Sequence, residues 1–112
     1  MVAEREPSQA LEMKDRQLRD YELLLIFSPE VADEDLEAKV DKVNQMILER
    51  GGLVSATEKR GKRQLSYPIG RFGEGTYVLI NLRLEPAQCQ QLEASLRISE
   101  EILRHLLTKL DS

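Results

Sequence analysis

The residues of this sequence best suited to chemistry are cations grouped in one stretch. The segment from Lys59 to Gly73 holds five of the sixteen lysines and arginines and no acidic residue, although the whole chain carries a net charge of −4. A concentration of positive charge in an acidic protein is typical of a surface that binds a polyanion such as nucleic acid. Short basic stretches are weak motifs, so a solvated, basic hairpin loop is the alternative.

Catalytic candidates are few. His105 is the only histidine, and no nucleophile is paired with it in the sequence. The only cysteine, Cys89, falls among the inward positions of a predicted helix, and Glu100 and Glu101 suit helix-end or solvated charges. One histidine and one cysteine do not supply the clustered ligands that a metal requires. The sequence therefore predicts no enzyme, metal site, cofactor or small-molecule substrate.

Length and composition indicate one intracellular domain. A chain of 112 residues with 41% apolar residues suffices for a single core, which must be aliphatic because tryptophan is absent. One cysteine excludes an intrachain disulfide and fits a reducing cytosol. The longest apolar run, Leu23 to Phe27, is too short to cross a membrane. Residues 1–18 lack a secretory signal and are predicted to be a disordered or frayed N-terminal extension, with Met13 an alternative start, ahead of a folded domain over residues 19–111.

The first half of the domain shows a strand and a helix. Tyr21 to Phe27 is short and apolar and is bounded by Ser28-Pro29, which favours a buried strand. Asp33 to Arg50 is predicted to be helical, with Asp33 as its cap and Gly51-Gly52 as its stop. One apolar stripe at the helical period supports this helix: Leu36, Val40, Val43 and Ile47.

The second half continues with two strands and a helix. A strand is predicted over Leu53 to Thr57, leading into the basic stretch, and another over Thr76 to Leu84, where apolar residues alternate. Glu85-Pro86 opens a second helix, with Cys89, Leu92 and Leu96 inward. For the tail, Ile98 to Leu110, the spacing slightly favours a helix, whereas a β-α-β-β-α sheet favours a closing strand.

Two nucleic-acid motifs are weak here. Gly70-Arg71-Phe72-Gly73 matches the GXXG clamp of KH domains, but that clamp joins two helices, so glycines in a turn between strands are the preferred interpretation. The outward side of the strand over Thr76 to Leu84 offers a single aromatic, Tyr77, followed by Leu79 and Asn81, too few aromatics for base stacking. Such a face suits a protein partner, or is simply a mildly apolar surface patch.

Several segments together resemble a known family. The most specific block is Gly61 to Ile69, GKRQLSYPI. The others are Tyr21-Glu22, Pro29, Gly51-Gly52, Gly75-Thr76-Tyr77, Leu96-Arg97-Ile98 and Ile102-Leu103-Arg104-His105. With these segments the sequence is similar, from about Arg19 to Asp111, to ribosomal protein six of the bacterial small subunit, of bacterial or plastid type.

The resemblance implies an α+β, ferredoxin-like β-α-β-β-α-β fold, with two helices on one face of a four-stranded antiparallel sheet and the tail as the last strand. It also implies a non-enzymatic, cytoplasmic, ribosome-bound protein, without a membrane partner. Such a protein binds the central domain of 16S ribosomal RNA beside ribosomal protein eighteen. Where many members carry an aromatic this chain has Arg60, and Asp20 replaces a second basic residue, which weakens the expected contact there.

Two residue sets follow. By the resemblance, with the basic stretch adding Arg60 and Lys62, the expected RNA-binding residues are Arg19, Arg60, Lys62, Arg71, Arg104 and Lys109. The expected protein-partner face comprises Arg63, Tyr67, Pro68, Ile69, Tyr77 and Leu79. The alternative hypothesis is a ferredoxin-like regulatory or self-associating interaction module without RNA, which would purify as a nucleotide-free homodimer.

Overall fold

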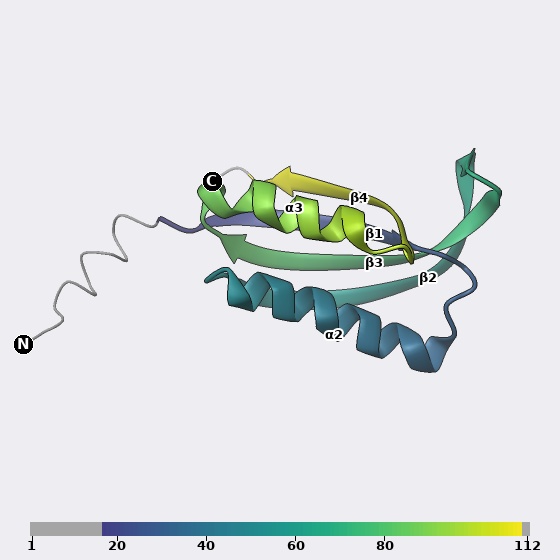
Figure 1. The fold of residues 1–112 in the computed structure, drawn as a ribbon, viewed down its shortest axis with the longest axis horizontal. Coiled ribbons are helices and arrows are strands. Elements are labelled where there is room, and N and C mark those ends of the chain that lie inside the picture. The colour runs from purple at the N-terminus through teal and green to yellow at the C-terminus, as the bar shows by residue number, and fades with distance from the viewer. Residues whose placement is uncertain (1–16, 111–112) are drawn as a thin grey trace, which may run out of the picture.

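The computed structural model describes residues 17–110. It consists of one antiparallel sheet, in the strand order β2-β3-β1-β4, with both helices on the same face (Figure 1). This arrangement confirms the predicted fold, including the tail as a strand. The prediction for residues 1–18 concerns residues that lie almost entirely outside the described range. The elements are β1 (Arg19–Phe27), α2 (Asp33–Glu49), β2 (Leu53–Ile69), β3 (Phe72–Leu84), a 3₁₀ turn (Pro86–Gln88), α3 (Cys89–Ile98) and β4 (Ile102–Lys109).

The core lies between the two helices and the sheet. Alternate residues of β1 and β3 point into it, and the stripe predicted on α2 meets them. Each fully buried leucine, isoleucine or phenylalanine contributes roughly 1.5–3 kcal/mol through removal from water. The largest fully buried side chains are Phe27, Leu23, Leu25, Ile47, Ile80, Leu82, Leu84, Leu92, Leu96, Val43 and Val78.

The ends of α2 differ in how well they were predicted. Asp33 is the first helical residue rather than the cap; the capping position is held by Ala32, whose side chain makes no capping hydrogen bond. The acids of the first turn act through the helix dipole instead. At the other end Gly51 has a φ of +80°, and the Gly52 N–H donates to the Ile47 carbonyl at 3.0 Å. The predicted glycine stop is confirmed.

The basic stretch is mostly strand, which corrects the expectation that a short strand ends at Thr57. β2 continues through the stretch to Ile69 and pairs with β3, with register shifts along the way. Only Gly70 and Arg71 form the turn, and Gly70 takes a φ of +61°, which suits a two-residue hairpin. The charged side chains are tolerated because β2 is an edge strand.

Candidate nucleic-acid and protein interface

The side of the sheet opposite the helices has an apolar centre. We call this surface the open face. Cross-strand pairing places Leu79, Leu24 and Leu106 side by side on β3, β1 and β4. The first two are half-buried, and 59% of Leu106 is exposed. In the next row Tyr77 and Ile26 lie beside Arg104. Sequence reasoning found Tyr77 and Leu79 but missed Leu24 and Leu106, because only strand register brings them together.

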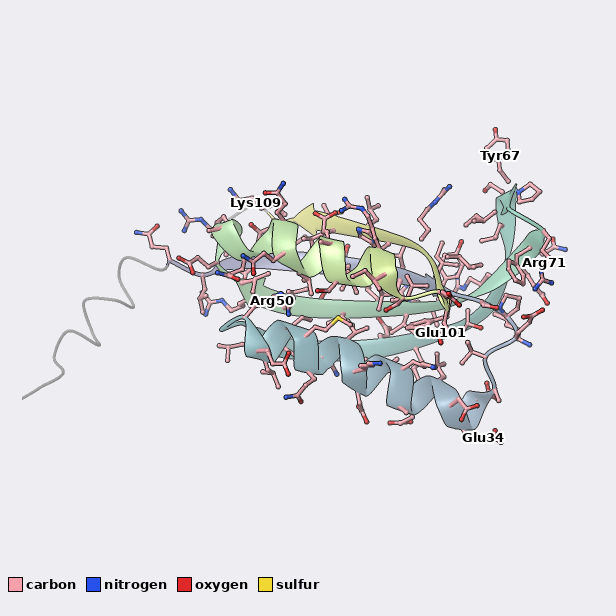
Figure 2. All side chains as sticks on the ribbon, in the orientation of Figure 1. Glu34, Arg50, Tyr67, Arg71, Glu101 and Lys109 are labelled. Carbon is pink, nitrogen blue, oxygen red and sulfur yellow. The ribbon has the colours of Figure 1, made fainter. Side chains whose placement is uncertain are left out.

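The six residues expected to face a protein partner fall into two groups. Arg63 pairs with Gly75 on the open face, and its guanidinium carbon lies 6.0 Å from the centre of the Tyr77 ring, a cation–π contact. Tyr77 and Leu79 share that face. The other three, Tyr67, Pro68 and Ile69, lie at the end of the β2–β3 hairpin, where 82% of Tyr67 is exposed (Figure 2).

Three of the five cations in the basic stretch are paired with acids. Lys59 contacts Glu37 of α2. Arg60 lies 2.9 Å from Glu58, and Arg71 lies 3.1 Å from Glu30. Each pair is largely exposed, and such pairs contribute about 0–1 kcal/mol. The positive charge presented by the folded stretch is therefore weaker than the sequence suggests.

Lys62 lies on the helix side of the sheet rather than on the open face. It pairs with Thr76 of β3 and lines a hollow that Asp33 and Leu36 of α2 also line. A phosphate contact at Lys62 would therefore approach from a different side of the sheet than a contact at Arg104.

The remaining cations expected to bind RNA are spread along the sheet. Arg19 and Lys109 lie near one end, since Lys109 pairs with Tyr21. Arg104 lies near the other end of β4, and Arg71 forms the hairpin turn beyond it. Figure 2 shows Lys109 and Arg71 at opposite ends of the molecule. The structure thus does not gather the six expected residues into one patch, and an RNA would have to contact several separate points.

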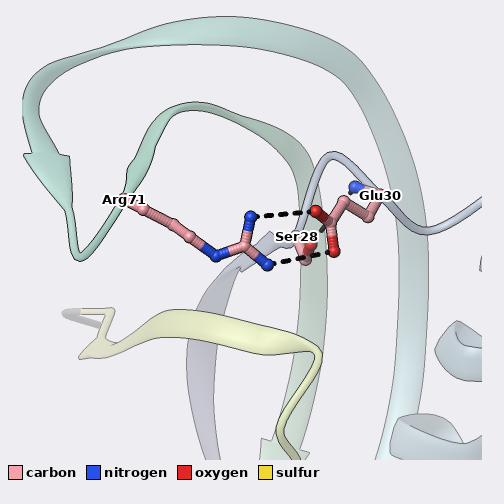
Figure 3. A network of polar contacts seen from close by, with 3 residues as sticks. All are labelled: Ser28, Glu30 and Arg71. Carbon is pink, nitrogen blue, oxygen red and sulfur yellow. Dashed lines mark hydrogen bonds and ion pairs between the residues drawn. The ribbon is translucent and has the colours of Figure 1, made fainter.

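Arg71 contacts two other side chains, Glu30 and Phe72. Its two terminal nitrogens face the two carboxylate oxygens of Glu30, at 3.1 and 3.5 Å (Figure 3). Its guanidinium carbon also lies 4.4 Å from the centre of the Phe72 ring. This arrangement ties the β2–β3 turn to the loop between β1 and α2.

The residues weighed as catalytic candidates have structural roles. His105 on β4 lies 3.0 Å from Glu93 of α3 and is mostly buried beneath that helix.

Tyr21 and Cys89 interact in the core. Burial is the larger cause, and a hydrogen bond with Cys89 the second, of a rise in the pKa of Tyr21 to about 12. Within residues 17–110 no three potential metal ligands come together, and no helix there is long and apolar enough to span a membrane.

The strand order and the two helices on one face define a small ferredoxin-like α+β protein. The family model described as Ribosomal protein S6 matches residues 20–109, and the chain belongs to that family. "Small ribosomal subunit protein bS6" of Dehalococcoides mccartyi is 38% identical over 93% of this chain and 95% of its own length. The bS6 protein of Exiguobacterium sibiricum is 40% identical over 82% of this chain and 97% of its own length.

A solved structure agrees with the family assignment. The crystal structure of 30S ribosomal protein S6 from Thermotoga maritima superposes with a TM-score of 0.79 at 34% identity, over 84% of this chain and 89% of that one. The resemblance in the sequence is thereby confirmed, as is the prediction that the chain is a structural protein and not an enzyme.

Proposed function

We propose that the protein is a structural constituent of the small ribosomal subunit, in the cytoplasm, that binds the central domain of 16S ribosomal RNA together with ribosomal protein eighteen. Its relatives are small-subunit proteins by name. The observation that carries the proposal is the open face, an apolar centre bordered by cations in a chain of the S6 family.

The RNA part of the proposal uses scattered phosphate contacts. Arg19 and Lys109 bind the phosphates of one segment of a folded RNA, and Arg104 and Arg71 bind those of another. Arg60 and Lys62 add phosphate contacts along β2. Phosphate contacts place a protein on a shaped RNA without reading its sequence. Because the net charge is −4 and several cations are already paired, the affinity of the protein alone is modest.

The protein part uses the apolar centre. Leu24, Leu79 and Leu106 leave an apolar row in contact with solvent, and burying it against a partner provides the added affinity. Arg63 and Tyr77 extend this contact toward the hairpin. Tyr67, Pro68 and Ile69 reach the same partner from the end of the β2–β3 hairpin, which extends past β1.

The proposal is tested by measuring binding to a transcribed central-domain RNA fragment with and without ribosomal protein eighteen. We expect tighter binding when the partner is present, and log K should fall by about 0.7–0.9 per phosphate neutralised for each tenfold increase in salt. Leu106→Ser should reduce the gain from the partner, whereas Leu48→Ser, at an exposed leucine of α2, should not. Binding that ignores both salt and partner would contradict the proposal.

Self-association without RNA is the second candidate, and one observation favours it. Leu106 is exposed on β4, an edge strand that a second copy could pair with. Sedimentation equilibrium of the purified, nucleotide-free protein separates the two hypotheses. RNA-free dimers that Leu106→Ser dissociates would support self-association, and a monomer that binds the RNA fragment supports the ribosomal role.

A further inference from the structure

The Glu30 carboxylate holds Arg71 in the geometry used for phosphates. Two terminal guanidinium nitrogens face two carboxylate oxygens, at 3.1 and 3.5 Å (Figure 3). A guanidinium makes the same two-pronged contact with a carboxylate and with a phosphate. The carboxylate therefore occupies the place that two phosphate oxygens would take.

The backbone of Glu30 is fixed even though its side chain is accessible. The Glu30 N–H donates to the Ser28 hydroxyl at 3.1 Å, and the Ser28 N–H donates to the Glu101 carbonyl at 2.8 Å. Ser28 itself is buried. By contrast, the side chain of Glu30 is 61% exposed and that of Arg71 is 72% exposed. Side-chain rotation alone can separate the pair, without opening the loop.

The surroundings of the pair oppose a shared site. The hollow beside Arg71 is also lined by Glu100 and Glu101, and Glu101 is engaged by Lys39 at 3.0 Å. A phosphate entering next to Glu30 would meet these carboxylates. Arg71 must therefore leave Glu30 to contact RNA. The Phe72 ring, 4.4 Å from the guanidinium carbon, still supports the cation after Glu30 is released.

We propose that Glu30 is an internal competitor of RNA phosphate for Arg71 and so lowers the affinity of this contact. The inference rests on the proposed RNA-binding function and deepens it. The acid that opposes binding lies on the loop between β1 and α2, 41 residues from the cation it controls. Exchange of one exposed anion for another is accessible because such pairs are weak.

The test is RNA binding by charge-matched variants. Glu30→Gln should tighten binding to the central-domain fragment by about two- to fivefold at ~0.1 M salt, the factor expected for release of one exposed pair. Glu34→Gln, at an exposed acid in the first turn of α2, makes the same change in net charge and should alter affinity far less. In an Arg71→Ala background the gain from Glu30→Gln should vanish. Thermal unfolding verifies that each variant folds.

The binding results either support or overturn the competition between Glu30 and RNA phosphate. A gain confined to Glu30→Gln and dependent on Arg71 supports the inference. Equal gains from Glu30→Gln and Glu34→Gln would show a general charge effect and overturn it. Weaker binding by Glu30→Gln would also overturn it, since the pair would then orient Arg71 for RNA. A wild-type protein that fails to bind the fragment even with its partner would instead contradict the proposed function, and the inference with it.

Discussion

Replacing Gly52 by alanine should destabilise the protein by a clash that can be located. A Cβ added there would lie 2.7 Å from the Arg83 carbonyl oxygen, 2.8 Å from Ile47 Cγ2 and 2.9 Å from Leu84 Cδ1. Ile47 and Leu84 are fully buried, and the carbonyl belongs to the backbone of β3. The two methyl groups are enclosed by the core and the carbonyl is held in the sheet, so none can move aside freely and the end of α2 or β3 must shift.

The expected loss follows from two opposing effects. Overpacking a core costs about 1–3 kcal/mol. Alanine also restricts the unfolded chain, which stabilises by about 0.4–1 kcal/mol. The difference is a net loss of about 0–2.6 kcal/mol in the free energy of unfolding. Because the shortest contact is with a backbone oxygen that cannot rotate away, we expect the upper part of this range, roughly 1–2 kcal/mol, or a fall of about 5–15 °C in Tm for a domain of this size.

Urea unfolding of three alanine variants tests this reasoning. Gly73→Ala meets no atom within 4 Å and should stay within about 0.5 kcal/mol of the wild type. Gly51→Ala also has open space but a φ of +80°, so it should lose about 1 kcal/mol through backbone strain alone. If Gly52→Ala proves as stable as Gly73→Ala, the close approach of α2 to β3 is wrong.

Three further outcomes are expected. Burial, and secondly a hydrogen bond with Cys89, raise the pKa of Tyr21 to about 12. The resulting contribution to the free energy of unfolding is therefore fully present below pH ~10 and falls by roughly 1–3 kcal/mol as the pH rises toward 12. Tyr21→Phe should flatten this alkaline slope in urea titrations. The hydrogen bond from Lys39 lowers the pKa of Glu101 below 4.5. The ionised Glu101 therefore adds at most about 0.5 kcal/mol to the free energy of unfolding above pH 4.5, and this contribution is lost as the pH falls further. Glu101→Gln should abolish this pH dependence in thermal unfolding between pH 3 and 6. Arg104→Ala should weaken RNA binding about two- to tenfold in filter binding without changing Tm.

Matched variants identify the cause of each effect. Tyr67→Phe, at an exposed phenol, should leave the alkaline slope unchanged, and a slope that survives Tyr21→Phe would contradict the assignment to Tyr21. Arg97→Ala, at an exposed arginine of α3 on the helix side, should leave RNA affinity near the wild type. Equal losses for Arg97→Ala and Arg104→Ala would place the RNA elsewhere.

The elements that sequence analysis predicted well are those whose pattern is set locally. The stripe of α2 repeats at the helical period, and all four predicted positions are buried. The alternation of β3 likewise gave its inward and outward residues, from Val78 to Leu84. In both cases burial on one side of a regular element dictates residue type at a fixed spacing.

Other features depend on contacts between distant segments. Continuation of β2 past Thr57 is set by its pairing with β3, and an edge strand rich in charge shows no apolar alternation. The tail pairs with β1 and is therefore a strand, although Ile102 and Leu106 keep a helical spacing. Pairing of Arg71 with Glu30 was equally hidden, because the two residues meet only after folding.

The most direct test of the central claim is the sedimentation of this protein in a lysate of its own cells. Sucrose-gradient fractions are probed for the chain, and the small-subunit fractions are washed at moderate salt. Most of the protein should sediment with 30S particles, at about one copy per 16S RNA. A protein found only in the light fractions, with 30S particles that lack it, would show that it is not a constituent of the small subunit.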